Sequence, residues 1–183
     1  MSATDDLRRD HKNVVRRLRD IAYAYSSYIY SSTRVPVDDV KNIISIIEYF
    51  ITVYHHHKEE YCYFPRVYGT RLEQEAHALK VEHELGRRIA SMLNSRLDEW
   101  ISNRSNSEPV ARILKAYADY LSVHMDREEN FFNEYDIMVS HDEQNHISEE
   151  FSSITNEKMS EHIFKDILNM LDRLEDCIRR GFI

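Results

Sequence analysis

The sequence contains few of the residues that break helices or form tight turns. Its 183 residues include only three Gly and three Pro. Collagen-like, low-complexity and linker-rich chains need far more of both residues, and so does a fold in which many tight turns join short strands. The scarcity of Gly and Pro therefore excludes the first three classes and argues against an all-β fold.

The sequence also lacks a cysteine motif. Cys62 and Cys177 are far apart and no Cys-x-x-Cys is present, which excludes a zinc ribbon and a thioredoxin-like motif. No apolar segment of the signal-peptide type follows Met1, and the most apolar stretch, residues 43–53, is too short to cross a bilayer. We therefore expect a cytoplasmic protein that does not bind membranes.

An excess of positive charge is missing as well. The chain has 24 Lys and Arg against 32 Asp and Glu, which gives a net charge of −8. Nucleic-acid binding depends on basic side chains that neutralise phosphates, so we expect no nucleic-acid partner. With 42% hydrophobic residues, the chain is long enough to form one domain with a sizeable core.

Apolar residues recur at helical spacing along almost the whole chain. The pattern predicts four long helices and two shorter ones, over residues 5–32, 37–63, 71–102, 109–135, 141–155 and 157–180. Long helices joined by short connections favour an all-α fold, an up-down antiparallel four-helix bundle with two extra C-terminal helices. We expect a single domain over residues 1–183, with its core in about 5–135 and an extension over about 136–183.

Two segments of the sequence repeat a pattern of possible metal ligands. When YHHHKEEYCYF is aligned with VHMDREENFF, His55 falls on His124 and Glu59 falls on Glu128. Each segment therefore contains His-x-x-x-Glu. Residues four apart lie on one face of a helix, so the imidazole and the carboxylate can reach the same metal ion.

The first and third predicted helices contain a second internal match. Asp10-His11 and Glu82-His83 each place an acid before a histidine, and a pair of arginines follows about one turn later. The chain thus contains a weak two-fold repeat of one metal half-site. Its candidate ligands are His11, His55, Glu59, His83, His124 and Glu128.

The number of ligands indicates two metal ions. Four histidines and two carboxylates are too many for a tetrahedral zinc site. Two irons, each bound by two histidines and sharing both carboxylates, use all six residues. An added oxo or hydroxo bridge makes each iron five-coordinate, with a position left for a small molecule. Ligands rich in imidazole, with carboxylates, favour iron over manganese or zinc.

Two His-x-x-x-Glu ligand pairs are possible in the second helix, because His56 and Glu60 have the same spacing as His55 and Glu59. The two pairs are about 100° apart around a regular α-helix. We favour His55 and Glu59, since this pair aligns with the pair in the fourth helix. His56 is then a supplementary ligand or a group that supports one, and His57 faces solvent.

Three other residues near these motifs need an interpretation. Tyr120 lies one turn before His124, where it either packs in the core or donates a hydrogen bond to a ligand at the centre. Lys58 and Arg127 precede the two glutamates and are most simply read as exposed charges.

These motifs together resemble the hemerythrin-like, or HHE cation-binding, domain family. The resemblance rests on Asp10-His11, then HHHKEE followed by Phe64-Pro65, then EHELGR, then HMDRE, and it covers about residues 5–135. It implies an up-down four-helix bundle with a non-haem di-iron site. It also implies chemistry with dioxygen or related small molecules such as peroxide or nitric oxide.

The sequence departs from the oxygen-carrying members in one respect. Those hemerythrins have a second histidine one turn before the one in the third helix, but here Leu79 lies four residues before His83. The chain contains no His-x-x-x-His. This departure argues against plain oxygen carriage, and it leaves binding, sensing and enzymatic turnover of small oxygen or nitrogen species, or sensing of iron, as alternatives.

Two other functions compete with this interpretation. A ferritin-like di-iron oxidase needs two Glu-x-x-His motifs, whereas this chain has only Glu143-x-x-His146. A metal-free helical regulatory module would use the histidines for packing alone. A cluster of tyrosines late in the first helix also suggests contact between copies of the chain; these are Tyr23, Tyr25, Tyr28 and Tyr30.

Overall fold

A computed structural model describes residues 2–104 and 106–182, and within them the only regular secondary structure is helix. The predicted all-α class is therefore confirmed. The short connections lie where the sequence placed its breaks, around Pro36, at Gly69 and between residues 103 and 108.

The first two helical rods are continuous but not uniform. The first rod contains α1 (Ala3–Asp10), the π-helical segment η1 (His11–Val15) and α2 (Arg16–Ser32). The second contains α3 (Val37–Ile46), the π-helical η2 (Ile47–His55), α4 (His56–Lys58) and the π-helical η3 (Glu59–Tyr63), followed by the 3₁₀ turn η4 (Phe64–Val67). A capping box between Ser2 and Asp5 satisfies the first backbone N–H groups of α1.

The third and fourth rods are the regular helices α5 (Glu73–Asn103) and α6 (Glu108–Met138), each 31 residues long. Helix α5 ends at Asn103, and the next residue, Arg104, has a φ of 54° that turns the chain out of the helix. Helix α6 begins with Pro109 in its first turn, where the missing N–H of proline is not needed.

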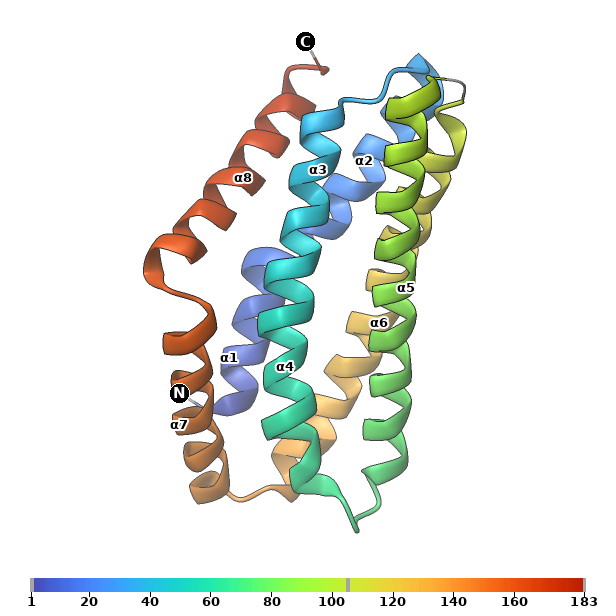
Figure 1. The fold of residues 1–183 in the computed structure, drawn as a ribbon. Helices are drawn as coiled ribbons and strands as arrows, with labels where there is room; N and C mark the ends of the chain where they lie inside the picture. The colour runs from blue at the N-terminus through green and yellow to red at the C-terminus, as the bar shows by residue number, and fades with distance from the viewer. Residues whose placement is uncertain (1, 105, 183) are drawn as a thin grey trace.

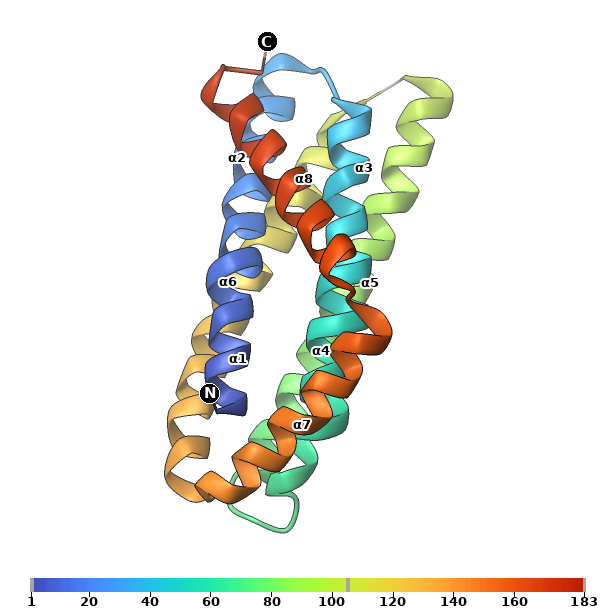
Figure 2. The ribbon, with the colours of Figure 1, turned by 90° about the vertical axis from the view of Figure 1, so that its left-hand side faces the viewer.

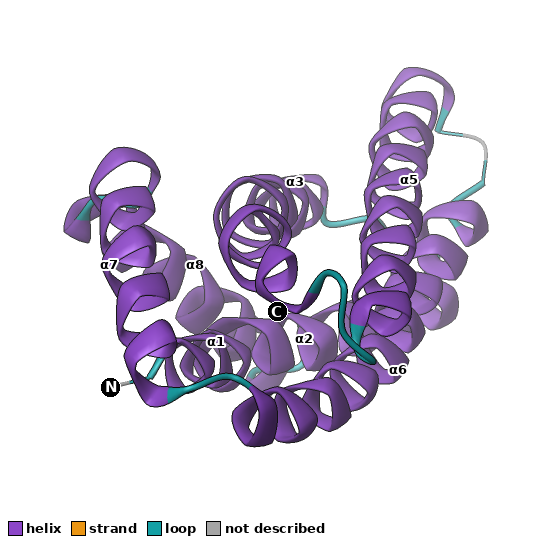
Figure 3. Cartoon of the chain, turned by 90° about the horizontal axis from the view of Figure 1, so that it is seen from below, coloured by secondary structure: helices purple, strands orange, loops and turns teal. Residues whose placement is uncertain are grey.

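The four rods lie alongside one another, and the chain reverses direction from each rod to the next (Figure 1). Helix α6 packs along both α2 and α5, and α3 packs against α5. Seen from below, the helices surround a common interior (Figure 3). Fully buried apolar side chains from all four rods fill this interior, among them Leu18, Ile21, Phe50, Leu93, Leu114 and Phe132.

The C-terminal helices α7 (His141–Lys158) and α8 (Glu161–Arg179) cover the outside of the first two rods (Figure 2). Ser140 and Ser160 cap their N-termini by accepting backbone hydrogen bonds from Glu143 and Ile163. Helix α7 packs against α1, η2 and η3, and α8 packs against α2 and α3. Both are long, but neither they nor any other described helix is apolar enough to cross a membrane.

Two of the four tyrosines late in the first rod pack within the chain. Tyr25 is buried and donates a hydrogen bond to Asp39 at 2.8 Å, while the ring of Tyr28 stacks on Phe182. Tyr23 and Tyr30 are exposed. Only these two remain for the contact between copies that the sequence suggested.

Candidate metal centre

The interior of the four rods contains a cluster of buried polar side chains. Seven residues with metal-binding side chains lie there, each at most 3% exposed: His11, His55, His56, Glu59, His83, His124 and Glu128. All six ligands predicted from the repeat are among them, together with His56. Each belongs to the face of its rod that also carries the apolar core residues, so the packing of the core brings them together.

The seven residues form two groups. His11, His55, Glu59 and Glu128 have ligand atoms within 4.8 Å of one another, and the atoms of His56, His83 and His124 are equally close. The first group therefore has two histidines and the second has three.

The two glutamates lie between the groups. Glu128 Oε2 is 3.2 Å from His11 Nε2, whereas its Oε1 is 3.3 Å from His83 Nε2 and 3.1 Å from His124 Nε2. Glu59 is similar, with Oε1 3.5 Å from His55 Nε2 and Oε2 3.4 Å from His83 Nε2. Each carboxylate thus has one oxygen near each group, which is the arrangement needed to bridge two cations.

Several potential metal-ligand atoms of the cluster have no hydrogen-bond partner within the protein. Both oxygens of Glu59, Oε2 of Glu128, Nε2 of His124 and Nδ1 of His56 are buried without a hydrogen-bond partner. Buried polar atoms are rarely left unpaired in native proteins. Two divalent cations bound by imidazole and carboxylate would satisfy most of these atoms at once.

Wide helical turns explain why His55 and His56 both join the cluster. The N–H of His56 donates to the carbonyl of Ile51, five residues back, and the N–H of Phe64 donates in the same way to Glu59. The prediction that His56 points about 100° away from the site assumed a uniform α-helix. The π-helical segments begin or end at the predicted ligands His11, His55 and Glu59, and such segments are frequent at functional sites.

Carboxylates on the outer side orient three of the histidines. Nδ1 of His55 lies 3.3 Å from Asp10, Nδ1 of His83 lies 2.8 Å from Glu60, and Nδ1 of His124 lies 2.8 Å from Glu82. Each Nδ1–H that donates to a carboxylate leaves Nε2 free to face the interior. Asp10 and Glu82 therefore support the histidine of a facing helix, not the one next to them in sequence.

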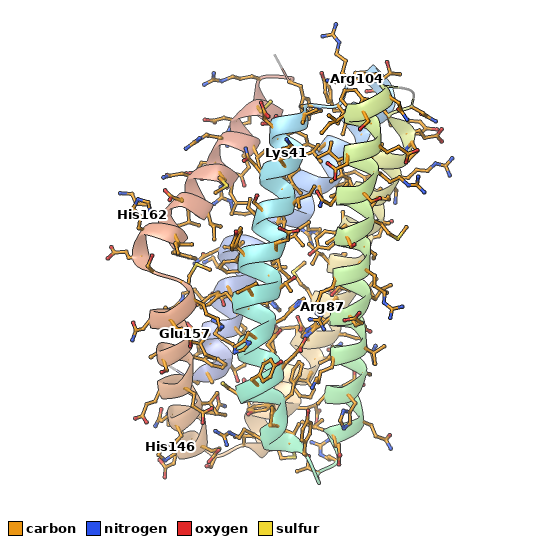
Figure 4. All side chains as sticks on the ribbon, in the orientation of Figure 1. Lys41, Arg87, Arg104, His146, Glu157 and His162 are labelled. Carbon is orange, nitrogen blue, oxygen red and sulfur yellow. The ribbon has the colours of Figure 1, made fainter. Side chains whose placement is uncertain are left out.

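A cation lies behind each of these carboxylates. Lys58 Nζ is 2.5 Å from Asp10 and Arg87 Nη1 is 2.9 Å from Glu60, while Arg127 pairs with Glu82. Figure 4 shows Arg87 at the seam between α4 and α5. The Asp10–Lys58 pair and the Glu82–Arg127 pair occupy matching places in the two-fold repeat.

Lys58 corrects one expectation from the sequence. It was read as an exposed charge, but its side chain is fully buried. Its ammonium bonds to Asp10 and to Asp6 at 2.9 Å, and it lies over the rings of Tyr54 and Phe151. Phe151 belongs to α7, so the C-terminal extension contributes to the cover over the Lys58 ammonium.

The remaining histidines lie away from the cluster. His77, His141, His146 and His162 are exposed, and His57 is half-buried outside both groups. Figure 4 shows the side chains of His146 and His162 at the outer edge of the molecule.

Burial and neighbouring charges set the protonation of the metal-free cluster. Burial lowers the pKa of His55 to about 4. Burial together with Glu128 raises the pKa of Glu59 well above its ordinary value. Burial also opposes a charge on His124, but Glu128 and Glu82 outweigh it and raise the His124 pKa to about 9. In the absence of metal, the cluster thus holds protons on some of the atoms that would bind cations.

The raised pKa of His124 predicts how the stability of the metal-free protein depends on pH. The unfolded chain has a histidine pKa near 6.5, so protonation of His124 stabilises the fold fully below pH 6.5, and this stabilisation is lost as the pH rises through 9. We expect the free energy of unfolding of chelator-treated protein to fall by about 3 kcal/mol over this range. Denaturant unfolding of wild type and His124→Gln checks this. A variant that shows the same decline as wild type would contradict the assignment.

Comparison with known proteins identifies the family. A family model described as the hemerythrin HHE cation binding domain matches residues 2–135, which include all seven clustered residues and end in the last turn of α6. No curated protein and no solved structure gives a significant match to the chain. The match covers well over half of the chain, and the chain therefore belongs to the hemerythrin HHE cation-binding domain family.

Proposed function

We propose that the chain is a non-haem di-iron protein that binds or senses dioxygen or a related small oxygen or nitrogen species, such as peroxide or nitric oxide. In this proposal the four rods form the up-down antiparallel four-helix bundle of a single cytoplasmic domain, and α7 and α8 are its extension. The observation that carries the proposal is the position of Glu59 and Glu128, each with one oxygen beside each histidine group.

The proposed centre holds two ions in unequal environments. With both carboxylates shared, His11 and His55 complete four protein ligands for one ion. The three histidines of the other group complete five. An oxo or hydroxo bridge would add one ligand to each ion, and the ion with two histidines then keeps an open position. The mixture of imidazole and carboxylate supports iron ahead of manganese or zinc.

The protein residues prepare this site in three ways. The outer carboxylates orient imidazoles, the shared carboxylates hold the two ions at one spacing, and the surrounding core keeps bulk water away. Iron bound in such a site supplies reversible redox chemistry and binding of small ligands. Both a sensor and an enzyme could use these properties.

Metal analysis of the purified protein tests the proposal. We expect about two irons per chain after anaerobic loading with Fe(II), and a change in the visible absorption spectrum when the reduced protein meets air. A chain that stays metal-free after loading would overturn the proposal and favour the metal-free regulatory module. A ferritin-like oxidase has less support, because Glu143 and His146 lie outside the cluster.

Two neighbouring histidines provide a matched pair of variants for the same experiment. His56→Ala removes one ligand from the three-histidine group and should reduce the bound iron or shift the spectrum. His57→Ala removes the next residue, which lies outside both groups, and should leave the iron content and spectrum unchanged. Equal results for the two variants would remove His56 from the ligand set.

A further inference from the structure

The hydroxyl of Tyr120 is a buried donor without an acceptor. Among the buried side-chain atoms that lack a hydrogen-bond partner, it is the one atom in the described part of the chain that does not belong to the cluster of histidines and glutamates. A tyrosine hydroxyl carries one O–H donor, and its ordinary pKa is near 10. Buried hydroxyls usually find a partner, because leaving one unpaired destabilises the fold.

The ring of Tyr120 is placed beside the three-histidine group. It stacks on His124, with ring centroids 5.2 Å apart and planes 14° from parallel. The phenol ring therefore lies directly against one of the histidines of the cluster.

Gly86 on α5 makes room for this ring. A Cβ atom at position 86 would lie 2.6 Å from Oη, Cζ and Cε1 of Tyr120, a separation that real side chains do not adopt. Gly86 lies inside a long regular helix, where glycine is the least favoured residue apart from proline. The backbone of α5 thus accommodates the phenol at the expense of helix stability.

The unpaired hydroxyl of Tyr120 and the helical glycine at position 86, both unfavourable for stability, therefore lie together next to the candidate metal centre. A phenylalanine at position 120 would remove the unpaired hydroxyl, and an alanine at position 86 beside a smaller neighbour would strengthen α5. Local violations of folding preferences tend to occur at functional sites, where a ligand supplies the missing interaction.

We infer that Tyr120 donates a hydrogen bond to a small exogenous molecule that occupies the open position and extends toward the three-histidine group, and so selects for ligands with an oxygen or nitrogen acceptor atom. This inference rests on the proposed function, since it requires bound iron. Tyr120 acts here as a specificity-determining residue and is not a metal ligand. The hydroxyl would gain the partner that the metal-free protein does not provide.

Azide binding to the oxidised, iron-loaded protein tests the inference. Tyr120→Phe removes only the hydroxyl and should weaken azide binding about tenfold, as expected for the loss of one hydrogen bond to a charged acceptor. Tyr117→Phe is the matched control, because Tyr117 is a buried tyrosine one turn earlier on α6. Its dissociation constant for azide should stay within about twofold of wild type.

A second measurement separates this role from packing. In the metal-free state, Tyr120→Phe should unfold at the same temperature as wild type or at a higher one, because the unpaired hydroxyl is gone. Equal azide affinity in Tyr120→Phe and wild type would overturn the inference, as would a lower unfolding temperature of the metal-free variant. A visible phenolate-to-iron band present in wild type and absent from Tyr120→Phe would overturn it too, since Tyr120 would then be a ligand. Failure of the proposed function would appear earlier, as wild-type protein that binds no iron.

Discussion

Replacing Glu128 with alanine is expected to deplete both metal ions with a single substitution. Glu128 is the residue whose two oxygens approach three histidines, His11 on one side and His83 and His124 on the other. Its removal takes a negatively charged ligand from both ions at once. We expect the iron content after Fe(II) loading to fall from about two per chain to well below one.

Variants that affect one group provide the comparison. His11→Ala removes a ligand from the two-histidine group only, and His124→Ala removes one from the three-histidine group only. Each should retain more iron than Glu128→Ala. Glu84→Ala removes an exposed glutamate from α5 and should leave two irons bound. Two irons in Glu128→Ala would show that the carboxylate is not shared.

The metal-free state gives Glu128→Ala a second expected effect. Burial opposes the charge of Glu128, yet the nearby imidazoles, His124 above all, hold its pKa well below the ordinary value. Without this carboxylate, protonated His124 would lose its buried counter-ion. We expect the His124 pKa to fall from about 9. An NMR titration of the metal-free variant measures this change independently of iron loading.

Much of this site could be predicted from sequence because helical spacing determines which side chains share a face. His55 and Glu59, and likewise His124 and Glu128, are four residues apart, so each pair had to point the same way once the helix formed. The repeat of these pairs after Asp10-His11 and Glu82-His83 indicated four rods that meet at one centre. The structure brings all six of these ligands together.

The remaining features depend on contacts and on local geometry that spacing alone does not encode. His56 joins the cluster because π-helical turns alter the register of the second rod. Asp10 supports His55 across two rods, and this pairing depends on how the rods are rotated against each other. The adjacent Asp10-His11 and Glu82-His83 pairs were a usable signal, although neighbours in sequence diverge on a helix. Each acid instead supports a histidine on another helix.

Lys58 and Arg127 occupy matching positions in the two-fold repeat but differ in how deeply their side chains are buried. Both follow a ligand histidine by three residues, and both pair with a carboxylate that supports an imidazole. Lys58 is fully buried beneath α7, whereas the Arg127 side chain is 39% exposed. Burial increases the energetic importance of an ion pair, since water cannot stabilise the partner that remains after one is removed.

Lys58→Met is therefore expected to destabilise the metal-free protein by about 3–5 kcal/mol, because it leaves buried Asp10 without its ammonium partner. Arg127→Met, the same change at the matching position, should cost less than about 1 kcal/mol, since water reaches the Arg127 side of its pair with Glu82. Denaturant unfolding of both variants measures the two losses.

Adding Asp10→Asn to Lys58→Met removes the stranded charge and should recover part of the stability. Equal losses in the two single variants, or no recovery in the double variant, would show that the buried charge does not determine the effect. The expected difference between the variants would instead show that burial, to which Phe151 of α7 contributes, determines the strength of the ion pair that supports His55.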